Sequence, residues 1–446
     1  MSPSILPRGP LGQPRNTPAD PASEQPTASA PEAPEPRAGP LPRGVAGTVE
    51  VPADVLNAAG IRPDDTVVFE AVPEGVRLTA DRLRRVYVEP TTRCNLDCVM
   101  CVRRAWAGGV GDMPLERFRL LLAGLPDAPA GEFSLVFAGY GEPLTHPELF
   151  EMIRATRDRG HRAELITNGF RVDRATAREL ALLGVAQVTV SVDGGDQAAF
   201  ASMRGAQLAG ALAGIEALVD ARLHTHAKMA IGVAAVATRR NVDTLPEVID
   251  TARRLGLEFV SISNVVPHTA EMAAEALTGS ATWASSFLAE GWQPRLRVAR
   301  FDAAESTRAL ASAVWGGGLT HPSPHIDPGG WRDHCRFVRE GMLAVSWDGR
   351  AAPCLSLLHT HPEHVNGQTR EVRSWTVGNV DRLPLGKIWR DPAYASFRLR
   401  VRAFDFPPCL TCGGCPLTES NEEDCYQTPF PSCGACLWAQ GLVLCP

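Results

Sequence analysis

Three cysteines that lie close together in the sequence have a spacing with clear chemical meaning. Cys94, Cys98 and Cys101 form a C-x3-C-x2-C triplet that follows a short apolar run at residues 86–88. Three thiolates at this spacing can hold three irons of a 4Fe-4S cube and leave the fourth iron open to a cofactor or substrate. The alternatives are a zinc site with no visible fourth ligand, or ordinary buried cysteines.

Nine further cysteines lie in the C-terminal part of the chain. They are Cys335, Cys354, Cys409, Cys412, Cys415, Cys425, Cys433, Cys436 and Cys445. Nine thiols are enough for two fully ligated 4Fe-4S clusters with one to spare. Zinc is the competing interpretation because the two C-x2-C pairs, Cys409/Cys412 and Cys433/Cys436, also fit a zinc ribbon. Clusters are favoured because Cys335 and Cys354 lie far upstream.

Three histidines follow Cys354 closely and could also be interpreted as metal ligands. His359, His361 and His364 lie among Pro and Thr residues, with no acidic or thiol partner in register. We therefore predict a solvated polar loop in this segment rather than a metal site.

Six short apolar runs, which alternate with amphipathic stretches, would have to position the first cysteine triplet. They lie at residues 86–88, 135–137, 164–166, 188–192, 231–236 and 259–262. This alternation predicts an α/β fold with six βα units in a partial, TIM-like (β/α)6 barrel. The loops after the strands form the reactive face of such barrels, and the triplet lies in one of these loops.

Composition divides the chain into five predicted segments. Residues 1–43 are rich in Pro, Ala and Ser and predict a disordered tail. Residues 44–82 have the short alternating runs of a small β module, and residues 83–290 form the barrel. Residues 291–334 are a connecting region, and residues 335–446 form a loop-rich domain in which inorganic cross-links supply stability.

The charge and the cysteine content limit the cellular setting. The 446 residues have a formal net charge of -6, which gives no general electrostatic reason to bind nucleic acid or an anionic membrane. No apolar run is long enough to cross a bilayer, and Pro and Arg replace the apolar core of a secretory signal. We predict a cytoplasmic protein in which clustered cysteines ligate metal rather than form disulfides.

The triplet and its context resemble the radical S-adenosylmethionine (SAM) superfamily from about Val86 to Ser263. The resemblance implies that Cys94, Cys98 and Cys101 bind the catalytic 4Fe-4S cluster and that the open iron chelates S-adenosylmethionine. Reduction of this cluster would then produce a 5'-deoxyadenosyl radical.

The same resemblance implies a set of cofactor-binding residues after the strands. Gly139, Gly141 and Glu142 belong to a segment similar to the family's GGEP motif, which receives the methionine amino group, although Tyr140 replaces the first glycine. Asn168, Ser191 and Asp193 lie where the family contacts the ribose and the methionine carboxylate. Arg204 is a candidate for this carboxylate because a guanidinium can pair with it in a fork; a surface helix cap is the alternative.

The C-terminal cysteines resemble SPASM domains, the auxiliary-cluster modules of peptide and enzyme maturases. The segment from Gly349 to Cys354 matches their G-x4-C element. The run C-x2-C-x2-C-x9-C that begins at Cys409 departs from the usual SPASM spacing, so cysteines cannot be assigned to individual clusters.

A finer resemblance, to maturases of tungsten-containing aldehyde:ferredoxin oxidoreductases, lies in residues 89–91, 101–106 and 433–446. It implies a protein or cofactor substrate, such as a tungsten-containing oxidoreductase, and an electron donor such as ferredoxin or flavodoxin.

Residues 51–78 resemble AbrB-like swapped-hairpin domains, many of which dimerise and bind DNA. Acidic residues outnumber arginines in this segment, which favours homodimerisation or docking through residues 44–82 over DNA binding. The alternative functions are a peptide-modifying, thioether-forming enzyme and, in another class, a redox-responsive DNA-binding regulator.

Overall fold

The computed structural model describes residues 50–446 except 63–64, 73–74, 107, 127–130, 132, 279–286, 290–294, 299–307, 316–334, 366, 413–414 and 445–446. The predicted tail, residues 1–43, and the predicted ligand Cys445 therefore lie outside the described residues. The chain divides into two units at Leu56. Helix α1 (Ala53–Ala58) spans this boundary, and all other elements belong to residues 57–446.

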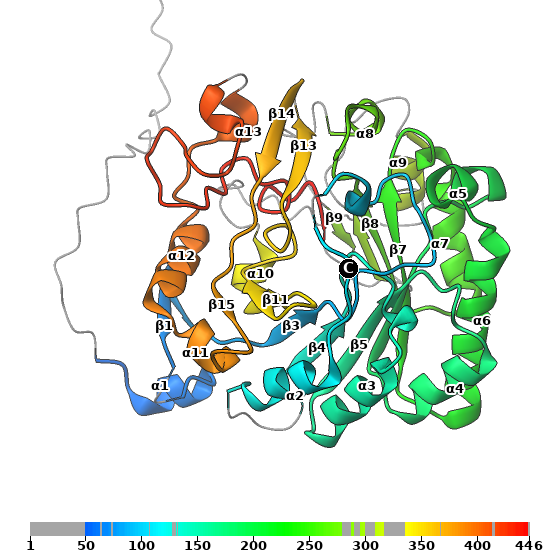
Figure 1. Cartoon of the computed structure of the whole chain (residues 1–446), viewed down its shortest axis with the longest axis horizontal. Coiled ribbons are helices and arrows are strands. Elements are labelled where there is room, and N and C mark those ends of the chain that lie inside the picture. The colour runs from blue at the N-terminus through cyan, green and yellow to red at the C-terminus, as the bar shows by residue number, and fades with distance from the viewer. Residues whose placement is uncertain are drawn as a thin grey trace, which may run out of the picture. The chain divides into compact units, whose positions relative to one another are not determined.

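Six parallel strands form the centre of the larger unit (Figure 1). In order across the sheet they are β3 (Arg85–Val88), β4 (Ser134–Phe137), β5 (Arg162–Thr167), β6 (Gln187–Ser191), β7 (Ala230–Ala237) and β8 (Phe259–Asn264). Five of them contain a whole predicted apolar run, and β6 contains all of its run except Val192. Most of their side chains are buried, as is typical of a parallel sheet covered on both faces. The predicted α/β class and partial barrel are confirmed.

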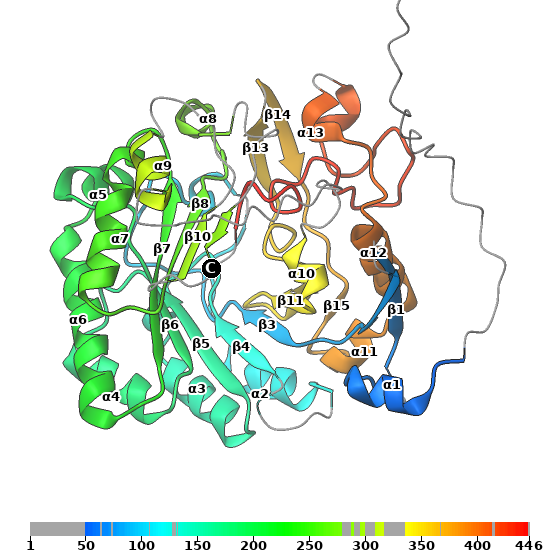
Figure 2. The same ribbon diagram turned by 180° about the vertical axis from the view of Figure 1, so that it is seen from behind.

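Helices follow the strands and cover the outer face of this sheet (Figures 1 and 2). They are α2 (Leu115–Ala123), α3 (Leu149–Asp158), α4 (Arg174–Leu182), α5 (Gln197–Arg204), α6 (Leu208–Thr225) and α7 (Leu245–Arg254). Helix α8 (Ala270–Glu275) and the short 3-10 turns η1 (Val102–Arg104), η2 (Pro143–Thr145) and η3 (Val242–Thr244) lie in segments that follow the carboxyl ends of strands. In α7, Leu245, Val248, Ile249 and Ala252 are buried. This i, i+3, i+4, i+7 spacing places the apolar stripe of the helix against the strands.

The sheet continues beyond the six strands on both sides. Beyond β8 lie β10 (Arg295–Val298), which is parallel to it, and then β9 (Phe287–Ala289). Beyond β3 lie β11 (Met342–Val345), which is parallel to β3, then β12 (Arg350–Ala352) and β15 (Gly378–Asn379). The sequence did not predict these strands. Because β11 pairs with β3, the barrel and the C-terminal region share one sheet.

The C-terminal region combines short elements with long loops. Its remaining elements are α10 (Arg336–Arg339), the hairpin β13 (His361–Val365) and β14 (Gln368–Val372), α11 (Leu385–Trp389), α12 (Pro392–Ala403), α13 (Cys409–Cys412) and η6 (Pro416–Thr418). Helix α9 (Arg308–Trp315) precedes this region and contacts α7. A buried ion pair joins α12 to the segment before β3: Arg398 Nη2 lies 2.6 Å from Asp81 Oδ2. The Arg398 guanidinium also lies 3.9 Å from the ring of Trp389, a cation–π contact.

A small antiparallel hairpin precedes the barrel. It consists of β1 (Val67–Val72) and β2 (Gly75–Ala80), which contain the runs expected in the N-terminal module. Asp65 and Arg82 form an ion pair across its open end. The resemblance to AbrB-like domains stays a prediction. In the part of the chain that the structure describes, no helix has the length and apolar character needed to cross a membrane.

Candidate functional site

The carboxyl ends of the parallel strands open into a cavity of about 320 Å³. Three of its lining residues are the cysteines of the predicted triplet, Cys94, Cys98 and Cys101. All seven predicted cofactor-binding residues line it as well: Gly139, Gly141, Glu142, Asn168, Ser191, Asp193 and Arg204. These ten residues come from five different parts of the sequence, and the strand ends bring them to one place, as expected for a parallel barrel.

The three cysteines lie in the loop between β3 and η1. Burial is the main cause that raises the pKa of Cys98 to about 12. The charge of Arg204 acts in the opposite direction, whereas Asp193 and the thiols of Cys101 and Cys94 add to the rise. Burial also raises the pKa of Cys101. Across the described residues, no three His, Cys, Asp or Glu side chains converge closely enough to hold a single metal ion. A 4Fe-4S cube has a different requirement, because each thiolate ligates its own iron.

Two glycines let the loop after β4 approach the cysteine loop. A Cβ atom at Gly141 would lie 2.2 Å from the carbonyl oxygen of Thr91 and 2.7 Å from that of Arg93. A Cβ atom at Gly139 would lie 2.6 Å from Cγ of Glu89. Both glycines therefore make close approaches within the protein that a side chain would prevent, while the choice of glycine that approaches the methionine amino group stays a prediction.

Glu142 is buried and joins two loops of the cavity. Its Oε1 atom accepts hydrogen bonds from Thr167 Oγ1 at 2.7 Å and from Leu144 N at 3.1 Å, and its Oε2 atom accepts one from Asn168 N at 2.7 Å. Burial raises the pKa of Glu142, and these donors act in the opposite direction. The carboxylate therefore fixes the loop after β4 to the loop after β5, while its contact with an ammonium group stays a prediction.

Arg204 forms a buried ion pair in the wall of the cavity. Its Nε donates to Asp193 Oδ2 at 2.6 Å, and its Nη1 lies 3.9 Å from Sγ of Cys98. The alternative of a surface helix cap is therefore wrong for this arginine, because only 10% of its side chain is exposed. Asn168 also reaches the cysteine loop, where its Nδ2 donates to Asn95 Oδ1 at 2.9 Å.

The extreme C-terminal segment forms a wall of the cavity that the sequence did not predict. Trp438, Val443 and Leu444 line the cavity. Leu444 N donates to Ser263 Oγ at 2.9 Å, and Asn264 Nδ2 donates to Leu442 O at 2.8 Å. Both polar side chains belong to the end of β8. In the sequence, these two residues stand out only because they follow a predicted strand. That position does not indicate that they bind the C-terminal segment.

Four of the C-terminal cysteines lie together. Burial raises the pKa of Cys433 well above its usual value, and the charges of Cys436, Cys335 and Cys354 raise it further. Cys409 lies beside them, since its Sγ would be 3.3 Å from a Cβ atom at Gly434. By contrast, Cys425 is exposed, Cys415 lines a second cavity, and Cys412 ends α13.

The histidines after Cys354 are not a solvated loop, and this prediction is wrong. His359 is 3% exposed, and its Nε2 lies 2.8 Å from Glu89 Oε2 at the end of β3. His361 is 1% exposed and lies 3.5 Å from Glu363. Only His364 lies at an exposed contact, with Thr369. The acidic partner of His359 is 270 residues away, so spacing along the chain could not show it.

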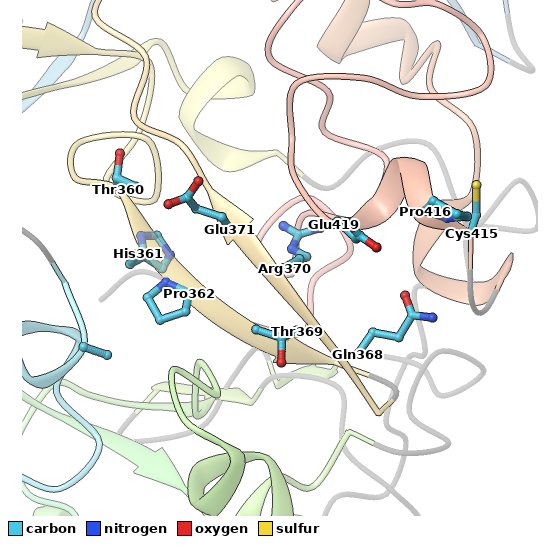
Figure 3. Close-up of a pocket in the computed structure, with 11 residues that line it drawn as sticks. Thr360, His361, Pro362, Gln368, Thr369, Arg370, Glu371, Cys415, Pro416 and Glu419 are labelled. Carbon is cyan, nitrogen blue, oxygen red and sulfur yellow. The ribbon is translucent and has the colours of Figure 1, made fainter.

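A second cavity, of about 700 Å³, lies against the β13–β14 hairpin (Figure 3). Its lining includes His361 and Arg370 from the hairpin and Cys415 and Glu419 from the segment after α13. Although burial raises the pKa of Glu363, the charges of Arg370 and His361 bring it down to about 2. His268 lies near these residues: it lines the first cavity, and its ring lies 5.6 Å from that of His361. Burial lowers the pKa of His268 to about 4.

The fold and the cavity define a radical SAM enzyme with an auxiliary iron–sulfur domain. Residues 88–234 match the radical SAM superfamily, and residues 335–416 match an iron-sulfur cluster-binding domain, SPASM. The chain is 30% identical over 371 residues to the tungsten-containing aldehyde ferredoxin oxidoreductase cofactor-modifying protein of Pyrococcus furiosus, covering 82% of this chain and 97% of that protein. The chain belongs to the same radical SAM family as the Pyrococcus furiosus protein.

Other relatives and solved structures include enzymes that act on peptides. The PqqA peptide cyclase of Streptomyces rochei is 26% identical, covering 78% of this chain and 88% of that protein. SuiB of Streptococcus suis bound to S-adenosylmethionine is similar in structure over 78% of this chain and 74% of SuiB, with 16% identity and a TM-score of 0.49. An anSMEcpe structure with bound AdoMet has the same identity and TM-score over 80% of this chain and 95% of that chain.

Membership of the superfamily decides the cofactors. S-adenosylmethionine and iron–sulfur clusters are the cofactors of the chain, as the cysteine spacing and the resemblance predicted. The match of residues 335–416 to a cluster-binding domain favours clusters over zinc in the C-terminal region.

Proposed function

We propose that this enzyme matures a tungsten-containing oxidoreductase by modifying the protein or its tungsten cofactor. The observation that carries the proposal is the similarity to the Pyrococcus furiosus cofactor-modifying protein, which extends over 97% of that protein. The similarity therefore includes both the barrel and the cysteine-rich region, and not the shared radical SAM core alone.

Cys94, Cys98 and Cys101 would hold the catalytic 4Fe-4S cluster, which when bound supplies the electron that cleaves S-adenosylmethionine to a 5'-deoxyadenosyl radical. Gly139 and Gly141, which have no side chain to block the approach, would let the backbone contact the methionine amino group. Asn168, Ser191 and Asp193, with Arg204, would contact the ribose and the carboxylate. The geometric support is that these nine residues, together with Glu142, line one cavity.

The remaining lining of the cavity would protect a reactive species. Val236, Val265, Val266, Trp438 and Val443 line it with apolar surface. Apolar side chains exclude water and so prevent side reactions of a reactive intermediate. The C-terminal wall is thus part of the reaction chamber.

For the auxiliary clusters, we propose that Cys335, Cys354, Cys433 and Cys436 hold one 4Fe-4S cluster. Cys436, Cys335 and Cys354 lie close enough to Cys433 for their charges to raise its pKa, which supports this grouping. Cys409, Cys412 and Cys415, with Cys425 or Cys445, are then candidates for a second cluster. Ferredoxin or flavodoxin would supply the electrons.

The test of this proposal compares substrates directly. Anaerobic enzyme, dithionite and S-adenosylmethionine are incubated with a tungsten-containing oxidoreductase that was produced without a maturase. The proposal predicts faster formation of 5'-deoxyadenosine and a mass change in the oxidoreductase or its extracted cofactor. Formation of 5'-deoxyadenosine with no change in either substrate would contradict it and leave the radical SAM assignment intact.

A peptide substrate is the second candidate, because the PqqA peptide cyclase of Streptomyces rochei matches 78% of this chain. A thioether or carbon–carbon cross-link in a co-expressed precursor peptide would favour it.

The hairpin β1–β2 supports a separate proposal of homodimerisation, since Phe69 and Val76 are 51% and 61% exposed.

A further inference from the structure

Arg204 lies against the cysteine loop in a way that its predicted contact with S-adenosylmethionine does not require. The arginine is the last residue of α5, and its Nη1 lies 3.9 Å from Sγ of Cys98. The backbone supports the same contact, because Val99 N donates to Met203 O at 3.0 Å. The end of α5 is therefore fixed to the cysteine loop by both main-chain and side-chain groups.

Buried hydrogen bonds hold the Arg204 guanidinium in place. Its Nε donates to Asp193 Oδ2 at 2.6 Å, and Oδ1 of the same aspartate accepts from Val236 N at 2.7 Å. Asn241 Nδ2 donates to the main-chain carbonyl of Asp193 at 2.9 Å. Movement of Arg204 toward another partner would break hydrogen bonds between buried groups, which costs more than it would at the surface.

A buried positive charge at this distance favours negative charge on the sulfur. The side chains of Arg204 and Asp193 are only 10% and 1% exposed, so little water screens either charge from the cysteine loop. Asp193, which pairs with Arg204, opposes its effect. In iron–sulfur sites, hydrogen bonds to the ligand sulfurs and nearby charges set the reduction potential. Reduction adds one negative charge, so a cation beside a ligand makes it more favourable, and an anion makes it less favourable.

We propose that Arg204 is a positioning residue that donates a hydrogen bond to the Cys98 thiolate and raises the reduction potential of the catalytic cluster, with Asp193 setting how much of its charge the cluster experiences. This inference rests on the proposed function, in which Cys98 is a cluster ligand. It gives Arg204 a role in the absence of S-adenosylmethionine.

The chain offers a matched control within the same loop. Arg104 pairs with Asp97 at 2.7 Å, but 46% of the Arg104 side chain and 77% of the Asp97 side chain are exposed. Water and salt screen such a pair, so its charges should have little influence on a buried cluster.

The experiment is a redox titration of the full-length, anaerobically reconstituted protein without S-adenosylmethionine, followed by electron paramagnetic resonance. The signal of the catalytic cluster is the one lost in the triple variant Cys94→Ala, Cys98→Ala, Cys101→Ala. We expect Arg204→Gln to shift its midpoint potential to more negative values, Asp193→Asn to shift it to more positive values, and Arg104→Gln to leave it unchanged.

Opposite shifts separate an electrostatic effect from simple distortion of the loop. Shifts of the same sign for Arg204→Gln and Asp193→Asn would overturn the inference, because distortion has no reason to follow charge. An unchanged potential with weaker S-adenosylmethionine binding in Arg204→Gln would also overturn it and leave Arg204 as a cofactor ligand only. If Arg204→Gln fails to assemble the cluster, Asp193→Asn carries the test alone. If the triple cysteine variant keeps every signal of the wild type, these cysteines hold no cluster, and the proposed function itself is refuted.

Discussion

Replacement of Gly141 by alanine is expected to weaken S-adenosylmethionine binding by about two orders of magnitude. The new Cβ atom would lie 2.2 Å from the carbonyl oxygen of Thr91, whereas non-bonded carbon contacts are comfortable at about 3.5 Å. The neighbouring Glu142 must then shift, although three donors hold its carboxylate. Binding requires the loop in its wild-type position, so the variant must leave its relaxed position when S-adenosylmethionine binds. A cost of about 3 kcal/mol for this step, comparable to two hydrogen bonds at about 1.5 kcal/mol each, is equivalent to about 100-fold in affinity.

Isothermal titration of S-adenosylmethionine into reconstituted protein measures this effect. Gly256→Ala is the matched control, because Gly256 follows the end of α7 with a φ of +64° and no heavy atom lies within 4 Å of the place that its Cβ atom would take. It should cost about 1 kcal/mol of stability and leave the affinity unchanged. Equal affinities for the wild type and Gly141→Ala would refute the argument that this backbone approach shapes the cofactor site.

Three further predictions concern stability and assembly. Asp81→Asn leaves Arg398 buried without its charge partner and should lower the free energy of unfolding in urea by about 3–5 kcal/mol. Asp381→Asn is the control, because it removes the more exposed partner of Arg117 and should lower the same free energy by less than about 1 kcal/mol. Because the pKa of His268 is about 4 in the fold and 6.5 in the unfolded chain, only the unfolded state takes up a proton as the pH falls from 6.5 toward 4. The free energy of unfolding therefore falls in that window, by about 2 kcal/mol at pH 5. His268→Gln should remove this part of the pH dependence, as measured by urea titrations at pH 7 and pH 5. An identical pH dependence in the wild type and the variant would contradict this prediction. Phe69→Glu should convert a dimer to a monomer in light scattering, and an unchanged mass would exclude dimerisation through the hairpin.

The sequence predicted the strands and the residues that follow them because both depend on local patterns. Each strand is a short apolar run, and parallel strands place the residues after them at one edge of the sheet. Cys94, Glu142, Asn168 and Asp193 could therefore be grouped before their contacts were known. Their partners were less predictable: nothing in the sequence indicated that Arg204 Nε donates to Asp193.

The features that the sequence did not predict are contacts between distant segments. β11 is four apolar residues, too short to distinguish a strand from buried helix, and its pairing with β3 has no local signal. The same holds for His359, whose polar surroundings in sequence suggested solvent, although it contacts Glu89 in the interior. Cys335 and Cys433 are similarly brought together by the fold and not by spacing.

The most direct test of the central claim is the yield of 5'-deoxyadenosine from anaerobically reconstituted protein with dithionite and S-adenosylmethionine. Wild-type protein should form it, and the triple alanine variant of Cys94, Cys98 and Cys101 should form none while retaining the iron of its auxiliary clusters. A triple variant that cleaves S-adenosylmethionine as fast as the wild type would contradict the assignment of these three cysteines to the catalytic cluster.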